Sequence, residues 1–276
     1  MRTAPPASPR TARPTPPSRW AERSPESGRF PGFVGGTWHF GPVTTALLDL
    51  VLPPRCAGCD APGALVCPSC AEEIRGEPAC RMPVPAPPGL PECWSAAEYA
   101  GAARRAIISY KERGRTALAR PLAGALALTV GTAVGGHPVV LVPVPSARPA
   151  LRRRGHDPVT RLAELAAGYL REAGWPVMVA GMLAHRRRLA DQAGLSSLQR
   201  AENLASAFKV AAGWDGLLAR SWEGAGVVVL VDDVVTTGAT LAEAARALRE
   251  AGTQAPLAVT LAATRRRGRP REGDGG

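Results

Sequence analysis

The sequence predicts an α/β fold in which helices flank a central, mainly parallel sheet, with a small cysteine-rich module in front of it. Two observations carry this prediction: short apolar runs alternate with helical segments after residue 94, and all six cysteines lie between positions 56 and 93. Strands that alternate with helices are typical of βαβ units, which build parallel sheets. A chain of 276 residues, 45% of them hydrophobic, is long enough to bury such a core.

Short runs rich in β-branched residues predict the strands, because such runs are typical of strands buried on both faces of a parallel sheet. The runs are VVLVP (139–143), VMV (177–179), VVVLV (227–231) and LAVTLAA (257–263). Apolar residues at helical spacing, and runs of Ala and Leu between breakers, predict the helices. These cover 102–109, 118–129, 158–173 and 240–251, the last closed by Gly252.

The basic charge of the chain lies mostly at its two ends. Of the formal net charge of +11, residues 1–40 carry +4 and residues 265–276 carry +3. Together with their many prolines, this predicts a disordered Pro/Arg-rich extension over 1–43 and a basic disordered tail over 265–276. Such ends either attract nucleic acid or acidic lipid through salt-sensitive charge, or are solvated without a partner.

Hydropathy predicts that no segment inserts into a membrane, since no run of about 20 apolar residues is present. The longest candidate, Leu122–Gly136, consists mostly of Ala and Gly. The first residues include arginines but no apolar segment of the kind found in secretory signals. The expected location is therefore cytoplasmic. An Arg/Ser-rich start is also typical of transit peptides, but its prolines oppose the amphipathic helix that these form.

The cysteine spacing predicts a structural zinc site in a module spanning residues 44–93. Two Cys-x-x-Cys knuckles can wrap four thiolates around one Zn²⁺, and metal binding then supplies folding energy to a short Pro-rich segment. The predicted ligands are Cys56, Cys59, Cys67 and Cys70. Disulfides are the alternative, which a cytoplasmic setting disfavours. Cys80 and Cys93 are not assigned to the site.

The segment VVVLVDDVVTTGAT (227–240) predicts a site for a phosphorylated ribose. After the strand and its acid pair, Asp232 and Asp233, a turn of small residues opens a helix, whose free N–H groups can hold a phosphate. Carboxylates beside a phosphate suit sugar hydroxyls or a Mg²⁺ ion. Since two adjacent carboxylates repel each other in an empty site, we expect neutralising both to leave stability equal or higher. An ordinary strand–turn–helix with an acidic edge is the alternative.

This segment resembles the 5-phosphoribosyl-1-diphosphate (PRPP) motif of type I phosphoribosyltransferases. Together with the cysteine module, three further segments resemble the ComF family of competence-associated phosphoribosyltransferase-like proteins. They are LLDLVLPPRCAGC (47–59), PVPSARPALRRRG (143–155) and DQAGLSSLQRAENLASAF (191–208). The resemblance implies a type I phosphoribosyltransferase fold over residues 94–264.

The resemblance also implies roles for individual residues. Asp232 and Asp233 would be catalytic and hold the ribose hydroxyls. The segment HRRRLADQ (185–192) has the composition of a mobile flap that closes on diphosphate, and a solvated helix end is the alternative for Arg186–Arg188. PRPP would be bound by Asp232, Asp233, Val234, Val235, Thr236, Thr237, Gly238, Ala239 and Thr240. Diphosphate would be bound by Ser146, Ala147, Arg148, Arg154, Arg187 and Arg188.

Two functions follow as expectations. In the first, the protein binds PRPP with Mg²⁺ and transfers the phosphoribosyl group to an unknown nitrogenous acceptor, with release of diphosphate, in the context of competence and DNA uptake. In the second, it is a non-catalytic binding protein with the PRPP fold that acts in DNA uptake or processing. Its partner would then be a competence helicase or single-stranded DNA. A homodimer is compatible with both.

Overall fold

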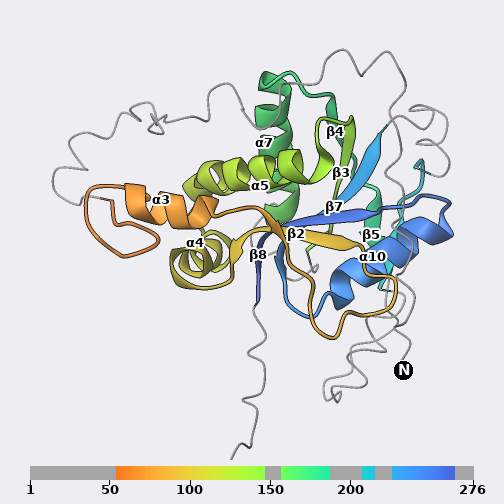
Figure 1. The fold of residues 1–276 in the computed structure, drawn as a ribbon, viewed down its shortest axis with the longest axis horizontal. Coiled ribbons are helices and arrows are strands. Elements are labelled where there is room, and N and C mark those ends of the chain that lie inside the picture. Colours follow the sequence, from red (N-terminus) through yellow and green to blue (C-terminus); the bar gives the residue numbers. More distant parts are fainter. Residues whose placement is uncertain (1–53, 147–156, 187–206, 215–225, 265–276) are drawn as a thin grey trace, which may run out of the picture.

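The computed structural model describes residues 54–146, 157–186, 207–214 and 226–264 (Figure 1). Within these residues the centre is a six-stranded sheet of order β1-β2-β8-β7-β3-β4, parallel except for β1, which runs antiparallel to β2. The strands are β1 (Ala79–Cys80), β2 (Glu92–Glu98), β3 (Val139–Pro143), β4 (Val177–Val179), β7 (Val227–Val235) and β8 (Leu257–Ala263). A separate antiparallel pair joins β5 (Leu183–His185) to β6 (Phe208–Val210).

Helices cover both faces of the central sheet (Figure 1). One face packs against α3 (Pro68–Arg75), α4 (Gly101–Glu112), α5 (Ala119–Val134) and α7 (Pro158–Glu172), and a short 3-10 turn, η1 (Thr116–Leu118), precedes α5. The other face packs against α10 (Ala239–Glu250) and the β5–β6 pair. The predicted α/β architecture with a mainly parallel sheet is confirmed.

Strand β7 shows how the sequence pattern produces this two-sided core. Val229 and Val231 pack among the residues of the α5 face, whereas Val228 and Leu230 pack among those of the α10 face. Successive side chains of a strand point to opposite faces, so an uninterrupted apolar run is buried on both. Each fully buried Val or Leu contributes about 1.5–3 kcal/mol relative to an exposed one.

The predicted elements agree closely with the observed ones, with one correction that matters for the site. The strands at 139–143, 177–179 and 257–263 have the predicted bounds, and the predicted helices differ from α4, α5, α7 and α10 only at their ends. The prediction that the strand beginning at Val227 stops before the acid pair is wrong. β7 continues to Val235, because Val234 and Val235 pair with Ala262 and Ala263 of β8.

One helical stretch in the described part of the chain, Thr116–Val134, is long and apolar enough to cross a membrane by length and composition alone. Of its most apolar window, 72% is buried inside the protein. Its main part, α5, packs against α7 and against β2 and β8. It is therefore the core helix of one layer, and its many small alanine side chains allow this close packing.

The cysteine-rich region contributes to the main core. Cys56, Cys70 and Ile74 are buried and belong to the hydrophobic cluster on the α5 face. Strand β1 and the first residues of β2 lie in the central sheet, so the predicted boundary between residues 93 and 94 falls inside β2.

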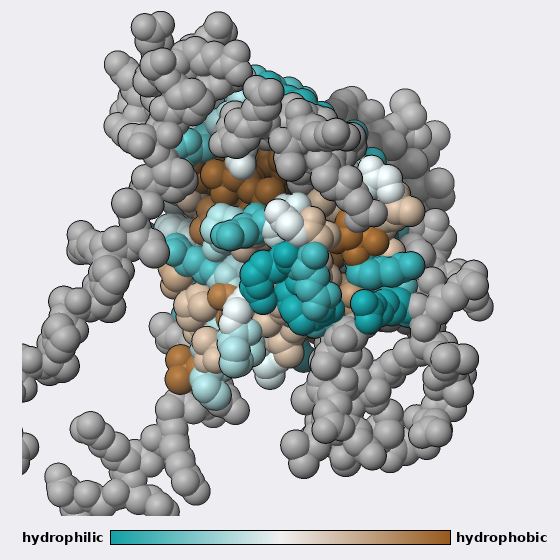
Figure 2. Space-filling model, turned by 90° about the vertical axis from the view of Figure 1, so that its right-hand side faces the viewer, coloured by the Kyte–Doolittle hydropathy of each residue, from teal (hydrophilic) through white to brown (hydrophobic). Residues whose placement is uncertain are grey.

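Figure 2 shows the right-hand side of the view in Figure 1, where α10 ends. Hydrophilic residues gather near the centre of this face, and hydrophobic residues lie beside them. On α10, Arg246 connects a buried acid to an exposed one. Arg246 binds Glu243, with Nε and Oε2 2.6 Å apart, and also Glu250 one turn later.

Candidate functional site

The two acids of the predicted PRPP motif lie in the last part of β7 and differ in their surroundings. Asp233 is buried, whereas Asp232 is half-buried. Each carboxylate accepts a hydrogen bond from the next backbone amide: Asp233 N–H donates to Asp232 Oδ1 at 2.8 Å, and Val234 N–H donates to Asp233 Oδ1 at 2.9 Å. The backbone thus orients both side chains.

Of the two acids, only Asp233 forms an ion pair with a side chain in the described part of the chain. The Lys111 ammonium, in the last turn of α4, forms an ion pair with Asp233 Oδ2. Burial raises the pKa of Asp232 well above its usual range, and the neighbouring charge of Asp233 adds to this, while Lys111 acts in the opposite direction. The expectation that both acids lack compensation without a ligand is therefore corrected, because the protein itself neutralises Asp233.

The predicted phosphate loop follows directly. Val234 and Val235 end β7, Thr236 and Thr237 are exposed, Gly238 caps α10, and Ala239 and Thr240 begin that helix. Gly238 has a φ of 78°, and a Cβ there would lie 2.8 Å from Leu90 Cδ2. Only glycine meets both conditions without strain. The loop thus presents exposed hydroxyls beside the N-terminus of a helix of 12 residues, where anions are stabilised.

Two cavities adjoin this loop, and Thr236 borders both. One, of about 330 Å³, lies toward α4 and is lined by Lys111, Asp233 and Ile108 among others. The other, of about 560 Å³, lies toward the segment 79–85 and includes Thr237. The loop therefore has open space on two sides.

Of the predicted diphosphate-binding residues, only Ser146 lies within the described residues; Ala147, Arg148, Arg154, Arg187 and Arg188 lie outside them. Ser146 follows β3, whose last residue, Pro143, pairs with Val231 of β7, directly before the acid pair. Its N–H donates to Asp157 Oδ2 at 2.7 Å, and its hydroxyl lies 3.2 Å from Asp157 Oδ1. Asp157 also caps α7 by accepting from two amides of its first turn. In this structure, therefore, the amide predicted to meet diphosphate binds a carboxylate.

Sequence reasoning did not identify Asp157 or the position of His185. His185, predicted to begin a flap, is the last residue of β5, and its Nε2 lies 3.0 Å from the carbonyl oxygens of Pro145 and Ser146. It donates to them when Nε2 carries the proton. The Asp directly before Pro158 was a usable signal, since Asp followed by Pro is typical of a helix start.

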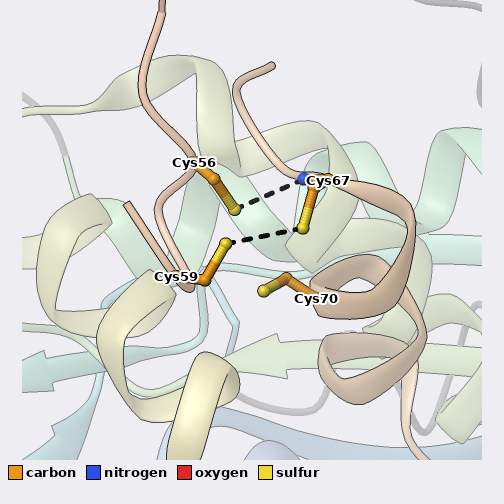
Figure 3. Close-up of side chains that lie close together, drawn as sticks. All are labelled: Cys56, Cys59, Cys67 and Cys70. Atoms are coloured by element: carbon orange, nitrogen blue, oxygen red, sulfur yellow. Dashed lines mark hydrogen bonds between the residues drawn. The ribbon is translucent and has the colours of Figure 1, made fainter. Parts of the chain in front are cut away.

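The four predicted zinc ligands converge at one point (Figure 3). Their Sγ atoms all lie within 4.8 Å of one another, and those of Cys59 and Cys67 are 3.7 Å apart. A tetrahedral zinc site with bonds of about 2.3 Å separates its sulfurs by about 3.8 Å. Cys56, Cys59, Cys67 and Cys70 therefore fit a metal ion such as zinc by donor type and by distance.

The surroundings of these thiols favour thiolates at two positions. The Ser69 hydroxyl is the main cause that lowers the pKa of Cys67 to about 6, and Cys67 caps α3. Burial alone would raise the pKa of Cys56, but N–H donors, including those of Cys67 and Gly58, lower it. Burial raises the pKa of Cys70, as expected where several thiols crowd together without a cation.

Helix α4 connects the cysteine cluster to the acid pair. The Arg105 guanidinium donates to the Gly58 carbonyl in the first knuckle, and the Ala102 amide donates to Glu73 Oε1 on α3 at 2.6 Å. About two turns further on, the same helix presents Lys111 to Asp233. The two candidate sites therefore share one rigid element.

The comparison with protein families agrees with the site. The family model of the phosphoribosyl transferase domain matches residues 221–274, which include β7, the phosphate loop, α10 and β8. This region is similar to a phosphoribosyl transferase domain. The match supports the expected likeness to the type I phosphoribosyltransferase superfamily in this part of the chain. No curated protein matches the chain.

Proposed function

We propose that the protein binds PRPP with Mg²⁺ and transfers its phosphoribosyl group to a nitrogenous acceptor, with release of diphosphate. One observation carries this proposal. Strand β7 presents an acid pair and then the exposed Thr236 and Thr237, which with Gly238 lead into α10, within a region similar to a phosphoribosyl transferase domain.

In this function the chain's residues bind and position rather than react covalently. The loop amides and the hydroxyls of Thr236 and Thr237 hold the 5-phosphate, and Asp232 and Asp233 hold the ribose hydroxyls. The bond from ribose C1 to diphosphate breaks with its electron pair going to oxygen, and the acceptor nitrogen bonds to C1 and gives up its proton to solvent. Positioning and fixed charge carry such a reaction. Mg²⁺ would neutralise the leaving group, and the Asp232 carboxylate is a donor that it accepts.

The test is a calorimetric titration of the full chain with PRPP and Mg²⁺, beside ribose 5-phosphate, followed by a diphosphate-release assay with a panel of nitrogenous bases. The double variant T236V/T237V should lose at least about tenfold in PRPP affinity, because it removes two hydrogen-bonding hydroxyls. Thr132→Val, at an exposed position of α5, is the matched control. No binding of PRPP by the parent protein would overturn the proposal.

We further propose that the protein is of the ComF type and acts in competence and DNA uptake, with zinc as the metal of the cysteine cluster. The support is the combination, in one chain, of a four-cysteine cluster with metal-site spacing and a region similar to a phosphoribosyl transferase domain.

One surface favours the second candidate function, binding of single-stranded DNA. A cavity of about 580 Å³ beside the cysteine cluster is lined by Arg104, Arg105, Arg113 and Arg115, with Asp60 as the acid among its lining residues. Arginines of this kind neutralise a phosphate backbone.

Fluorescence anisotropy with a labelled oligothymidylate tests this candidate. The double variant R104A/R113A should weaken binding and lower the salt dependence of the affinity, whereas Arg161→Ala, at an exposed position of α7, should not. Equal affinity of both variants would reject this surface as the DNA site.

A further inference from the structure

The cavity of about 330 Å³ between α4 and the end of β7 has a mixed lining. Tyr99, Ile108 and Val234 give it apolar walls, and Asp233 and Thr236 border it on the side of the PRPP motif. The three apolar residues are half-buried, as expected of side chains that line an open cavity. Concave sites with apolar walls and a few polar groups bind small molecules, and this volume suits a small one.

The strand order places this cavity on one side of β7 and the predicted diphosphate site on the other. The order within the central sheet is β2-β8-β7-β3, and these strands are parallel, so their carboxyl ends lie along one edge. Ser146 follows β3. Tyr99 follows β2, and its N–H donates to the carbonyl of Ala263, the last residue of β8, at 2.8 Å. The cavity therefore lies on the β8 side of the acid pair, and diphosphate is predicted on the β3 side.

A displacement at ribose C1 needs its two reacting groups on opposite sides of that carbon. The acceptor nitrogen approaches from the side away from the departing diphosphate, with the reacting orbitals in line. With Asp232 and Asp233 on the ribose hydroxyls and diphosphate toward β3, the side of C1 left for the acceptor faces β8 and α4. The cavity lined by Tyr99 and Asp233 lies on that side.

The second cavity beside the loop, of about 560 Å³, has a less suitable position for an acceptor. In the described part of the chain, its lining includes Thr236 and Thr237 but neither acid. These two hydroxyls belong to the predicted phosphate end of PRPP, and the 5-phosphate and C1 lie at opposite ends of the sugar. A ligand in this cavity would therefore meet the phosphate end instead of the reacting carbon.

The lining of the cavity at α4 also indicates the chemical class of the acceptor. The Tyr99 ring and the Ile108 side chain offer apolar surface, which suits the face of a planar heterocycle. The charged lining residues are Lys111, Glu112 and Asp233, one cation and two acids, so an anionic acceptor would meet net negative charge. A neutral planar heterocycle fits both features.

We propose that this cavity is the acceptor site and that the acceptor is a small neutral nitrogen heterocycle stacked against Tyr99. This inference rests on the proposed function and names the acceptor class that the function leaves open. In the step, the acceptor nitrogen bonds to C1 with its own electron pair. The bond from C1 to oxygen breaks with its pair leaving on diphosphate, and the proton of the nitrogen goes to solvent.

Two variants of the full chain, each filling one of the two cavities, test the placement. Diphosphate release is measured at saturating PRPP and Mg²⁺ with uracil, cytosine, adenine and hypoxanthine as neutral heterocycles. Orotate is the anionic heterocycle, and glutamine and ammonium are acceptors without a ring. Ile108→Trp should lower release by about tenfold or more, while the PRPP affinity in calorimetry stays within about threefold of the parent. Met82→Trp, in the other cavity, should match the parent in both measurements.

Tyr99→Leu tests the stacking separately. It keeps apolar area but removes the ring, so the KM for the heterocycle should rise about threefold to tenfold at unchanged PRPP affinity. Tyr99→Phe keeps the ring and is the matched control, which should behave as the parent. Should Ile108→Trp fail to fold, the comparison of these two variants decides alone.

The outcomes that overturn the inference are distinct from one another. Loss of release in Met82→Trp but not in Ile108→Trp would place the acceptor in the other cavity. A loss of PRPP affinity in Ile108→Trp as large as its loss of release would show that the cavity belongs to PRPP. Release with only orotate, glutamine or ammonium would reject the neutral heterocycle. A parent that binds PRPP but releases diphosphate with none of these acceptors overturns the inference and leaves PRPP binding in place. A parent that does not bind PRPP overturns the proposed function, and the inference with it.

Discussion

The cysteine cluster and the acid pair solve the same electrostatic problem in different ways. Each brings like-charged groups together: four thiols within 4.8 Å of one another, and two adjacent carboxylates on β7. The cysteine cluster has the donors for a cation that must come from outside the chain. The acid pair takes a cation, Lys111, from within it. With a metal bound, the first arrangement would make stability depend on that metal, whereas the second makes it depend on a tertiary contact.

The largest expected effect concerns the metal. Cys70→Ser should abolish stoichiometric metal binding and lower the free energy of unfolding by several kcal/mol, because structural metal sites contribute roughly 10–16 kcal/mol of binding energy and Cys70 is part of the core. Metal analysis and chemical denaturation measure both effects. Cys80→Ser, an exposed position outside the cluster, is the control and should change neither. Unchanged metal content in Cys70→Ser would show that the cysteine cluster does not depend on this ligand for metal binding.

The next effect concerns the internal cation. Lys111→Met should lower the free energy of unfolding by about 1–3 kcal/mol, less than a fully buried pair would give because Lys111 is 29% exposed. The exposed pair of Arg55 and Asp60 offers a matched control, since Arg55→Ala should cost under about 1 kcal/mol. Urea denaturation of both variants measures the difference. Equal losses in the two variants would mean that the Lys111 pair acts as a surface contact.

The smallest effect concerns Asp232 and is a change with pH. Since burial raises its folded-state pKa, the folded protein holds this proton more tightly than the unfolded chain. The stability contribution is present at acid pH and is lost as the pH rises from about 4, the ordinary aspartate value, through the raised pKa. Melting temperatures across this range should fall less in Asp232→Asn than in the parent. The same fall in both would show that Asp232 does not titrate there.

These predictions replace the expectation that neutralising both acids leaves stability equal or higher. Asp232→Asn removes a charge that burial opposes, whereas Asp233→Asn leaves Lys111 without its partner. The two substitutions should therefore act on stability in opposite directions.

What the sequence could predict is what lies close together along it. The spacing of the four cysteines is local, so it predicted their convergence, and the apolar runs predicted β3 and β8 with their observed bounds. The β-branched pair Val234 and Val235 was available as a signal that β7 continues past the acids. The pairing of this Val pair with β8, however, depends on a contact between segments that are distant in the sequence.

What the sequence could not predict depends on contacts between remote segments. Nothing in the spacing links Lys111 to Asp233, because the ion pair exists only once α4 packs beside the end of β7. In the same way, the approach of Leu90 to Gly238 depends on where the segment between β1 and β2 lies. The sequence predicts that Gly238 lies close to a bound anion. The structure shows that Gly238 also lies close to the Leu90 side chain.

The attachment of α4 at both ends has a thermodynamic consequence. Its first turns are held by Arg105 to Gly58 and by the Ala102 amide to Glu73, and its last turn is held by Lys111 to Asp233. Any movement of the knuckles that α4 follows changes the work needed to form the Asp233 contact. By linkage, a ligand that favours one setting of the helix favours metal retention by the same factor. The cysteine cluster and the acid pair are thus joined through one helix.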